Sequence, residues 1–542
     1  MILVVYLPEI RLKAIWNDHF FRYHITTFLP NYIRIKLMEQ TIIEDLPQII
    51  DDARKAQQTW SEVPVKTRAK RISAIRDYLV QSADETARLI HEVTGKSRID
   101  ALSTEVISTA NAVRYYSRQA PKFLRPRSIS AGHIVFSFKR SKVYRHPFGV
   151  IGIISPWNYP FTIPFHEVVI ALLSGNAVML KPASRTQKVG VMIEECIQAA
   201  DLPSGLFRLV KMPGNVAGDA LMNSGIDKLF FTGSVAVGKL LMAKASQSLT
   251  PVSLELGGND AMIVCEDADL ERAANGALWG SLQNSGQSCG GIERIYVHDS
   301  VYDTFLDLLR RKLHHLSVGD NEANDYELGP MISQEQAEKT RAHLTQALES
   351  GAQVYAQSPA LETNIQDAFV PAMVLTNVTH EMQIMQEETF GPVLGVMKYA
   401  QIEEAIRMAN DSHMGLTGSV WSKNQKRAEA IGRRIEAGAV MINDHLMSHG
   451  LPETPWGGFK QSGIGRTHGK FGFDEMTQPQ VIIRDTLPFV KKNYWWYPYD
   501  EHLYQSLKAL LELLHSKSIW QRIGKFFKVL RAVPRIFQSW DE

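Results

Sequence analysis

The distribution of apolar and polar residues divides the chain into a helical N-terminal part and a longer part in which short apolar strands alternate with helices. Between residues 42 and 121, apolar side chains recur at helical spacing, for example at Leu46, Ile49 and Ile50. From Val150 the pattern changes, and strands are expected at residues 150–154, 177–180, 207–210 and 229–231, with helices between them. This alternation predicts an α/β fold of the Rossmann type, with a parallel sheet and crossover helices.

A second stretch of strand and helix alternation follows Glu255. Strands are expected at residues 261–264, 294–298 and 440–443, and a helix at residues 270–283. These segments predict a second α/β domain. Residues 139–146 and 480–483 have strand-like patterns outside both stretches.

Composition is that of an ordinary globular protein of two or three domains. The 542 residues are 45% apolar and 21% charged, and a net charge of +2 makes a nucleic-acid partner unexpected. The cysteines Cys196, Cys265 and Cys289 provide no disulfide framework and favour a reducing, cytoplasmic location.

The first 37 residues are apolar but interrupted by charges, and they lack a signal-peptide pattern. One hypothesis is that translation starts at Met38.

Two short segments carry candidate catalytic chemistry. Cys289 lies in G-Q-S-C-G-G at residues 286–291, where small neighbours leave its sulfur accessible, and Glu255 lies in L-E-L-G-G at residues 254–258. A reactive cysteine needs surroundings that favour the thiolate and a partner that handles protons. Taken singly, Cys289 is more often a small buried residue, and Glu255 a surface or paired carboxylate.

Further motifs follow in a specific order. They are P-W-N-Y-P at 156–160, K-P-A-S at 181–184, F-T-G-S at 231–234, E-E-T-F-G-P at 387–392 and P-W-G-G-F-K-Q-S-G at 455–463. Together with L-E-L-G-G and G-Q-S-C, they make the chain resemble the aldehyde dehydrogenase superfamily from about Thr41 to about Leu487. The resemblance implies an NAD(P)-dependent, non-acylating aldehyde dehydrogenase that forms a homodimer or homotetramer.

The resemblance implies a role for each catalytic candidate. Cys289 would attack the aldehyde to form a thiohemiacetal, whose oxyanion can expel hydride toward a nicotinamide. The side-chain amide of Asn158 and the backbone N–H of Cys289 would stabilise that oxyanion, although Asn158 could instead cap the helix that follows it. Glu255 would activate water to hydrolyse the resulting thioester, so a free carboxylic acid is the expected product.

A cofactor site is expected at the carboxyl ends of the first set of strands. The G-x-G-x-x-G pattern of dinucleotide-binding turns is incomplete, because residues 233–238 keep only the outer glycines. The resemblance nevertheless implies a site for NAD or NADP and no metal. Its residues would be Pro156, Trp157, Lys181, Ser184, Gly233, Ser234, Glu388 and Phe390. Lys181 would reach the adenosine ribose, and Glu388 the nicotinamide ribose, with Phe390 beside the ring.

The third residue after Lys181 bears on the choice of cofactor. Strict NAD users in the family often have a glutamate there, which repels a 2′-phosphate, whereas this chain has Ser184 followed by Arg185. We therefore predict that NADP is accepted, or even preferred.

Domain boundaries follow from these assignments. Residues 1–40 form an N-terminal extension, 41–122 and 145–255 the cofactor-binding domain, 256–445 the catalytic domain, 123–144 and 478–487 a bridging sheet used in oligomer contacts, and 488–542 a C-terminal extension. The bridging sheet and its role are implied by the resemblance alone.

The C-terminal extension has the composition of an interfacial helix. An aromatic cluster at residues 494–499 precedes two apolar helical stripes with Lys and Arg between them. The first stripe is Leu507, Leu510, Leu511 and Leu514, and the second is Trp520, Ile523, Phe526, Phe527 and Leu530. This pattern predicts peripheral contact with a membrane surface, and the alternative is a helix packed on the oligomer. Contact with lipid would make medium- or long-chain apolar aldehydes plausible substrates.

Other functions remain open at this stage. Ser184 also resembles NADP-using semialdehyde enzymes, but no arginine in the motifs can be assigned to a substrate carboxylate, which disfavours a succinic-semialdehyde-type dehydrogenase. Cys289, Asn158 and Glu255 could also hydrolyse esters without a cofactor. A non-catalytic membrane-associated scaffold is a third possibility, against which the intact Cys289 and Glu255 argue. Dependence of activity on NAD(P) distinguishes these functions.

Overall fold

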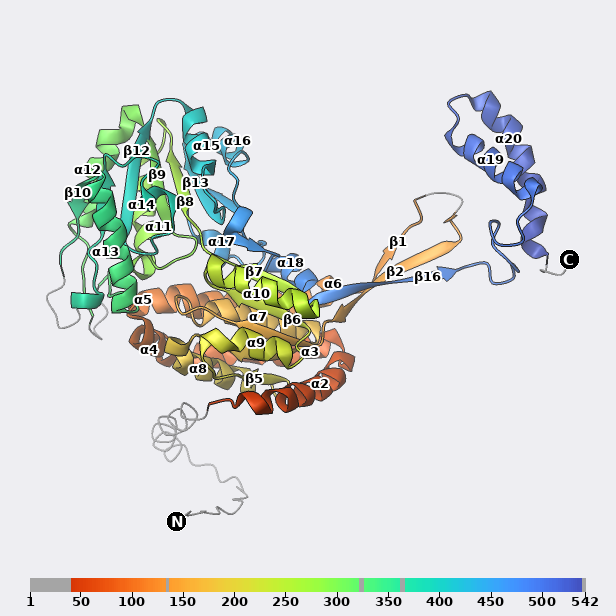
Figure 1. The fold of residues 1–542 in the computed structure, drawn as a ribbon, viewed down its shortest axis with the longest axis horizontal. Coiled ribbons are helices and arrows are strands. Elements are labelled where there is room, and N and C mark those ends of the chain that lie inside the picture. The colour runs from red at the N-terminus through yellow and green to blue at the C-terminus, as the bar shows by residue number, and fades with distance from the viewer. Residues whose placement is uncertain (1–39, 133–135, 321–325, 361–365, 539–542) are drawn as a thin grey trace, which may run out of the picture. The chain divides into compact units, whose positions relative to one another are not determined.

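The computed structural model describes residues 40–132, 136–320, 326–360 and 366–538, which form two compact units (Figure 1). The first unit contains the described residues up to Leu124 together with His146–Gln478, and the second contains those of Arg125–Arg145 and Pro479–Glu542. Apart from Gln40, the predicted N-terminal extension lies outside the described residues.

A six-stranded sheet in the order β15-β7-β6-β3-β4-β5 forms one half of the first unit. The strands are β3 (Val150–Ile154), β4 (Ala177–Lys181), β5 (Phe207–Leu209), β6 (Lys228–Thr232), β7 (Val252–Glu255) and β15 (Gly463–Ile464). All neighbours pair in parallel except β15 with β7, which pair antiparallel. Strand β3 is buried at every position, as expected of a parallel strand covered on both faces.

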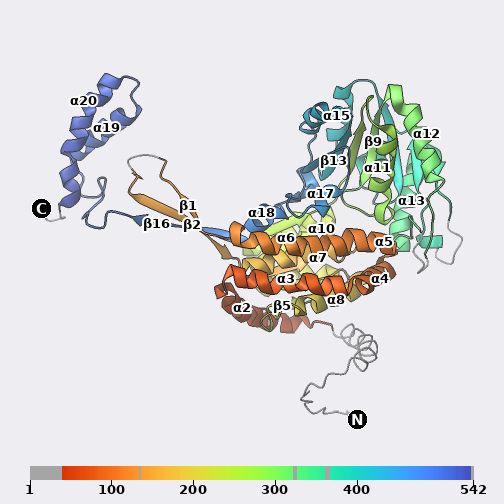
Figure 2. The same cartoon turned by 180° about the vertical axis from the view of Figure 1, so that it is seen from behind.

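Helices cover both faces of this sheet. Helix α7 (Thr162–Ser174) packs on one face, with α3 (Val65–Gln81) and α6 (Ser108–Phe123) outside it (Figure 2), and α9 (Gly214–Asn223) and α10 (Val235–Ser248) pack on the other. Every residue of α7 is buried, because the helix lies between the sheet and other helices. The remaining elements here are α2 (Leu46–Glu62), α4 (Ala83–Thr94), α5 (Arg98–Asp100), the π-helix η2 (Ala101–Ile107) and α8 (Gln187–Gln198).

A seven-stranded sheet in the order β10-β11-β12-β9-β8-β13-β14 forms the other half of the first unit. The strands are β8 (Asp260–Val264), β9 (Ile292–His298), β10 (Gln353–Gln357), β11 (Met373–Thr376), β12 (Val393–Tyr399), β13 (Thr417–Trp421) and β14 (Ala439–Ile442). Only β10 and β11 pair antiparallel. The helices are α11 (Leu270–Leu282), α12 (Tyr302–Leu313), α13 (Gln334–Glu349), α14 (Gln383–Gln386), α15 (Ile402–Asn410), α16 (Gln425–Gly432), α17 (Met447–Gly450) and α18 (Gly469–Glu475).

The second unit combines a three-stranded sheet with a helical hairpin. The sheet has the order β1 (Arg127–Ile129), β2 (Lys139–Pro147) and β16 (Thr477–Asp485), and an ion pair of 2.6 Å joins Lys139 to Asp485. The hairpin consists of α19 (Glu501–His515) and α20 (Ile519–Arg531). The predicted α/β fold with two sheets and a small third sheet is thus confirmed. The predicted leucine stripe of α19 is only partly correct, because the helix buries Leu503, Ser506 and Ala509 and exposes Leu511.

Candidate active site

A strained turn between α11 and β9 presents the predicted nucleophile. Asn284, Ser285 and Gly286 have φ angles of 53°, 55° and 75°, which non-glycine residues adopt only where surrounding contacts hold them. A Cβ at Gly286 would lie 2.3 Å from the carbonyl oxygen of Gly391, so the close approach of two backbones requires glycine there. The turn places the partly exposed Cys289 at the boundary of three cavities.

Asn158 lies after β3 and faces this turn. Its side-chain Nδ2 donates to the carbonyl oxygen of Gln287 at 3.1 Å, and Asn158 lines the same cavity as Cys289. The alternative role as a helix cap is wrong, because α7 begins at Thr162 with Phe161 as its N-cap residue. An amide nitrogen carries two hydrogens, so one donor of Asn158 is still available for an oxyanion.

Glu255 lies at the carboxyl end of β7, beside Cys289, and is buried. Burial, with the charge of Glu167 as a smaller cause, raises the pKa of the Glu255 carboxyl well above its ordinary value. The low-polarity surroundings of Cys289, and then the carboxylates of Glu388, Asp260 and Glu255, raise the pKa of the thiol. Both groups therefore favour their neutral forms, and a proton must leave the cysteine before it can react.

An apolar cavity of about 260 Å³ leads to one side of Cys289. Its larger side chains are Tyr159, Ile163, Trp279, Leu446, Met447, His449 and Trp456. Burial lowers the pKa of His449 to about 4, so this imidazole is neutral. The described residues that line it include no Lys, Arg, Asp or Glu. The sequence motifs indicated only Tyr159 and Trp456 among these, because a cavity wall is assembled from segments far apart in the chain.

A second cavity, of about 210 Å³, reaches Cys289 from the carboxyl edge of the six-stranded sheet. Six of the eight predicted cofactor residues line it, namely Pro156, Trp157, Gly233, Ser234, Glu388 and Phe390. The other two lie next along the sheet: Lys181 ends β4, and Ser184 begins a short 3₁₀ helix, η4 (Ser184–Thr186). A Cβ at Gly214 would lie 3.4 Å from Lys181 Nζ, so the start of α9 leaves little room beside that ammonium group.

The contacts around this second cavity suit a dinucleotide. Ser234 accepts a hydrogen bond from the N–H of Val237 at 3.4 Å and caps α10, whose N-terminal N–H groups favour a pyrophosphate. Glu388 Oε1 accepts from the N–H of Gly258 at 3.0 Å, and a Cβ at Gly257 would lie 2.3 Å from Glu388 Oε2. The residues present therefore fit the nicotinamide and pyrophosphate parts of NAD(P).

Comparison with known proteins agrees with this geometry. The profile of the aldehyde dehydrogenase family matches residues 34–482 of the chain. The chain belongs to this family. It is an NAD(P)-dependent aldehyde dehydrogenase, and the predicted family, enzyme class and cofactor are confirmed. The role of each individual site residue stays a prediction.

Similar proteins include enzymes named for different substrates. A 4,4'-diapolycopene aldehyde oxidase from Methylomonas sp is 38% identical over 500 residues, which are 92% of each chain. A putative succinate-semialdehyde dehydrogenase [NADP(+)] 2 from Mycobacterium ulcerans is 36% identical over 440 residues, 81% of this chain and 84% of the relative. The NAD+ complex of a Bacillus cereus aldehyde dehydrogenase is 33% identical with a TM-score of 0.78, covering 82% of this chain and 90% of that one.

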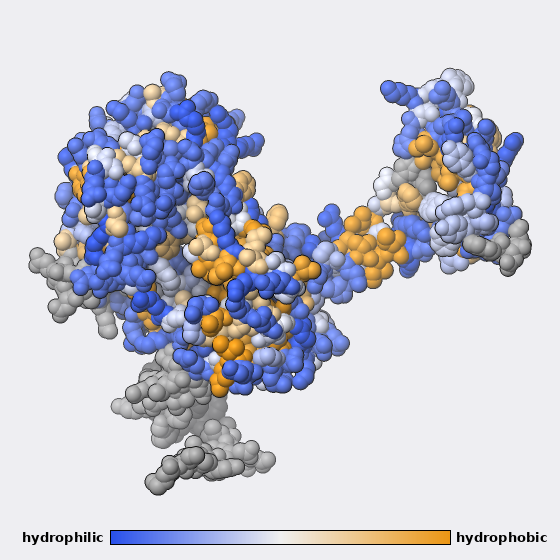
Figure 3. Space-filling view, in the orientation of Figure 1, coloured by the Kyte–Doolittle hydropathy of each residue, from blue (hydrophilic) through white to orange (hydrophobic). Residues whose placement is uncertain are grey.

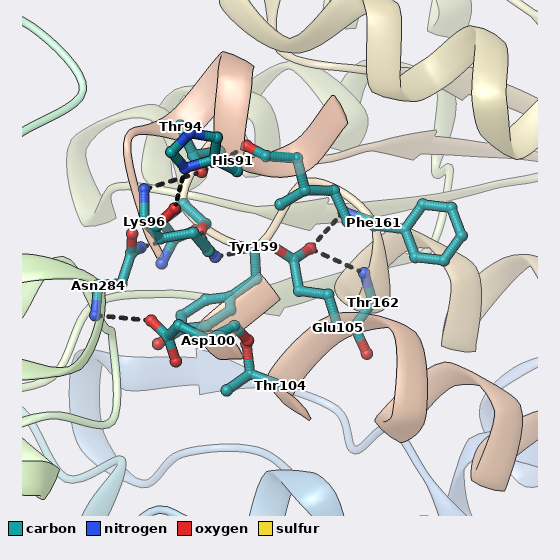
Figure 4. A network of polar contacts seen from close by, with 12 residues as sticks. His91, Thr94, Lys96, Asp100, Thr104, Glu105, Tyr159, Phe161, Thr162 and Asn284 are labelled. Carbon is teal, nitrogen blue, oxygen red and sulfur yellow. Dashed lines mark hydrogen bonds and ion pairs between the residues drawn. The ribbon is translucent and has the colours of Figure 1, made fainter. Parts of the chain in front are cut away.

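A buried ion pair lies within a network of polar contacts in this aldehyde dehydrogenase (Figure 4). Lys96 Nζ lies 2.7 Å from Glu105 Oε1 and donates to the carbonyl oxygen of Asn158 at 2.9 Å. Glu105 Oε2 accepts from the N–H groups of Phe161 at 2.8 Å and Thr162 at 3.2 Å. Both charged side chains are fully buried. The pair therefore holds the segment that carries the Asn158 amide. It could not be predicted from the sequence, because neither residue belongs to a motif.

Replacing Lys96 by methionine is expected to lower the free energy of unfolding by about 3–5 kcal/mol, because Glu105 would keep a buried charge without its partner. The exposed Lys70→Met on α3 is the matched control and should change stability by about 0.5 kcal/mol or less. Denaturant unfolding measures both. Equal midpoints for Lys96→Met and the wild type would contradict the prediction.

The sequence motifs also did not indicate several residues that line or support the cofactor cavity. Gln336 and Lys339 of α13 line the cofactor cavity, and Lys339 Nζ donates to the carbonyl oxygen of Glu388 at 3.1 Å. Glu293 accepts from the N–H groups of Thr389 at 2.7 Å and Phe390 at 3.0 Å, which fixes the loop that carries Glu388. A lone glutamate or lysine in a helix or strand has no signal that distinguishes these roles from an ordinary surface position.

Proposed function

We propose that this enzyme oxidises uncharged, apolar aldehydes of medium or long chain to carboxylic acids. The observation that supports this most is the cavity wall beside Cys289, where aromatic and aliphatic side chains meet the substrate and the described lining residues include no cation. A substrate carboxylate there would lose water without gaining a partner, which is costly. The similarity to a diapolycopene aldehyde oxidase favours the same substrate class. The similarity to semialdehyde dehydrogenases favours a substrate with a carboxylate, but the described residues of the cavity wall include no cation to pair with it.

In this proposal the thiol proton of Cys289 passes to solvent water and the sulfur adds to the aldehyde carbon, so that the carbonyl oxygen becomes an oxyanion. The free hydrogen of Asn158 Nδ2 and the backbone N–H of Cys289 stabilise that charge. Bound NAD(P)+ supplies the hydride acceptor. Glu255 then takes a proton from water, the water oxygen bonds to the thioester carbon, and the sulfur of Cys289 leaves. The product is the free acid.

Turnover measured with straight-chain aldehydes from acetaldehyde to hexadecanal, and with succinic semialdehyde, tests this proposal. We expect kcat/KM to rise with chain length and to be at least about tenfold lower for succinic semialdehyde than for hexanal, a difference of ~1.4 kcal/mol. Equal values for the two would contradict an apolar specificity. Cleavage of an ester without NAD(P), and no oxidation of any aldehyde, would favour the esterase instead.

The adenosine end of the cofactor site supports use of NADP. Ser184 and Arg185 are both exposed, three and four residues after Lys181, and no carboxylate takes the place from which a 2′-phosphate would be repelled. We expect Ser184→Glu to lower kcat/KM for NADP by about tenfold or more, while Ser184→Gln, of the same size without the charge, changes it little. Initial rates with NADP and NAD decide this. An unchanged NADP/NAD ratio in Ser184→Glu would show that this position does not select the cofactor.

Exposed apolar surface supports a homodimer or homotetramer. Such side chains gather over α10 in the first unit and on the three-stranded sheet of the second (Figure 3). They include Val237, Leu240 and Met242 of α10 and Val481, Ile482 and Ile483 of β16, all at least 43% exposed. Patches of this kind are typical of interfaces. Light scattering of the purified protein measures the oligomeric state, and a monomer would contradict the proposal.

Peripheral membrane contact through α20 is a further part of the proposed function. Among the described residues, no helix is both long and apolar enough to span a bilayer. Helix α20 buries none of its residues, and its apolar side chains Ile519, Trp520, Ile523, Phe526, Phe527 and Leu530 are 46% to 79% exposed. The helix carries four Lys or Arg and no Asp or Glu, and residues 491–542 have nine basic and five acidic residues. An anionic lipid surface complements both features.

We expect the full-length protein to float with anionic liposomes, and Trp520→Glu/Phe527→Glu to float at least about tenfold less, because two charges would enter the apolar face. Gln521→Glu, which adds a charge to the polar side of the same helix, is the matched control and should float nearly as well as the wild type. Equal flotation of the double variant and the wild type would show that α20 does not bind lipid.

A further inference from the structure

An apolar cavity of about 260 Å³ lies wholly within the second unit. Its wall is formed by β2, by the end of β16 and the segment that follows it, and by α19, α20 and the 3₁₀ helix η9 (Val533–Phe537). None of the residues assigned above to catalysis or cofactor binding lines it. The apolar side chains of the wall include Phe138, Leu487, Val490, Leu510, Val529 and Ile536.

Hydrogen bonds between distant segments hold the wall of this cavity together. The N–H groups of Lys491 and Lys492 both donate to the carbonyl oxygen of Ile536, at 3.0 and 3.3 Å. At the sheet, the N–H of Thr486 donates to the carbonyl oxygen of Phe138 at 2.9 Å. The cavity is therefore a built part of this unit.

One wall residue, Lys492, is a buried cation without an anion. It is 8% exposed, and its ammonium group forms no ion pair with the residues that the structure describes. Asp485 is the one acid among the described wall residues, and it pairs instead with Lys139 at 2.6 Å and accepts from the N–H of Leu487 at 2.8 Å. Lysines are almost never buried unless they are paired. A bound anion would supply the missing partner of Lys492.

The volume of the cavity indicates how long an apolar ligand it can hold. An apolar cavity of about 150 Å³ is large enough to hold benzene. By the same ratio, the 260 Å³ found here has room for roughly ten carbon atoms. Both chains of a phospholipid would not fit, whereas a single short or medium hydrocarbon chain would.

We propose that this cavity binds a free carboxylate with one unbranched hydrocarbon chain of about ten carbons. The chain contacts the apolar wall, and the carboxylate pairs with Lys492. Acids of this class are also what the proposed function forms, so the ligand has two possible sources, the enzyme's own product and a fatty acid from outside. The existence of the site does not depend on the proposed function.

Photolabelling of the purified full-length enzyme tests the proposal, with a decanoic acid that carries a diazirine at the end of its chain. In the absence of NAD(P), labels mapped by peptide mass spectrometry should fall within residues 487–536. Lys492→Met keeps the length of the side chain without its charge and should raise the half-maximal concentration by about tenfold or more. The exposed neighbour in Lys491→Met is the matched control and should change it by less than about twofold.

A neutral competitor and a filled cavity separate the two parts of the site. Decanol should compete with the label more weakly than decanoate in the wild type, and as well as decanoate in Lys492→Met. Val529→Phe places a larger side chain in the cavity and should abolish labelling of residues 487–536. Unchanged resistance of this variant to limited proteolysis shows that its second unit is folded.

Several outcomes would overturn the proposal. They are equal half-maximal concentrations in Lys492→Met and the wild type, and labels confined to the substrate cavity beside Cys289. Equal labelling by a diazirine phospholipid in liposomes would replace the free carboxylate by a lipid chain. Labelling that appears only after removal of residues 539–542 would show that the C-terminus of the chain itself occupies the cavity.

Decanal with NADP distinguishes the two sources of the carboxylate. Competition with the label in the wild type, and none in Cys289→Ala, would identify the product as a ligand of the site. Free acid formed without competition would identify a fatty acid from outside, and labelling by the diazirine acid supports the site in either case. The free acid measured in the same samples reports on the proposed function separately, and labelling of Cys289→Ala shows binding without turnover.

Discussion

Replacing Cys289 by alanine is expected to reduce aldehyde oxidation by about 10⁴-fold or more, and to remove the burst of reduced nicotinamide. Cys289 is the one cysteine that lines the cavities described above, and the oxyanion donors have nothing to stabilise unless its sulfur adds to the aldehyde. Steady-state and rapid-mixing assays measure both effects.

Cys265→Ala is the matched control for Cys289→Ala. Cys265 is fully buried in the core of the second sheet, where it packs against apolar residues. The control should therefore lose some stability and keep its turnover per folded molecule. Substantial NAD(P)-dependent oxidation by Cys289→Ala would refute covalent catalysis by this residue.

Replacing Glu255 by glutamine should lower steady-state turnover by about 10²–10³-fold while the burst remains. Glutamine keeps the shape of the side chain but cannot take a proton from water, so the thioester would accumulate. In the wild type the raised pKa of Glu255 implies that hydrolysis accelerates as pH rises through that pKa, because the carboxylate is the active form. The variant should lose this pH dependence.

The burst amplitude shows at which step Glu255 acts. A full burst followed by slow turnover places its effect in hydrolysis. A burst that is lost together with turnover would show that Glu255 is needed to accept the proton of Cys289. Wild-type turnover in Glu255→Gln would contradict both roles.

The elements of the fold that could be predicted are those with a distinctive local pattern of apolar residues. Strand β3 is a continuous apolar run, so its burial on both faces was visible in the sequence. The two residues of β15 carry no strand pattern, and only their pairing with Leu254 and Glu255 makes them a strand. Helix α20 was correctly predicted as amphipathic, but that its apolar face is uncovered could be learned only from the structure.

The candidate site was predictable to the extent that its residues lie in motifs. Cys289, Glu255 and Asn158 come from three separate segments, and the structure brings them to one boundary between cavities, as expected. Glu167 has no such mark, because it looks like any acidic residue in a helix. One carboxyl oxygen of Glu167, Oε2, is buried without a hydrogen-bond partner in the described part of the chain, and a sequence cannot show that.

The pairing of β15 with β7 has a consequence for biosynthesis. Gly463 and Ile464 are made about two hundred residues after Glu255 and Leu254, yet they form the outer strand beside the predicted catalytic base, where the N–H of Leu256 also donates to the carbonyl oxygen of Ser462 at 2.9 Å. Until this late segment emerges from the ribosome, β7 is an open sheet edge, and open edges are prone to pair with other chains. The growing polypeptide thus carries an aggregation-prone edge at its future catalytic centre, which makes β7 the region where a chaperone would protect the nascent enzyme.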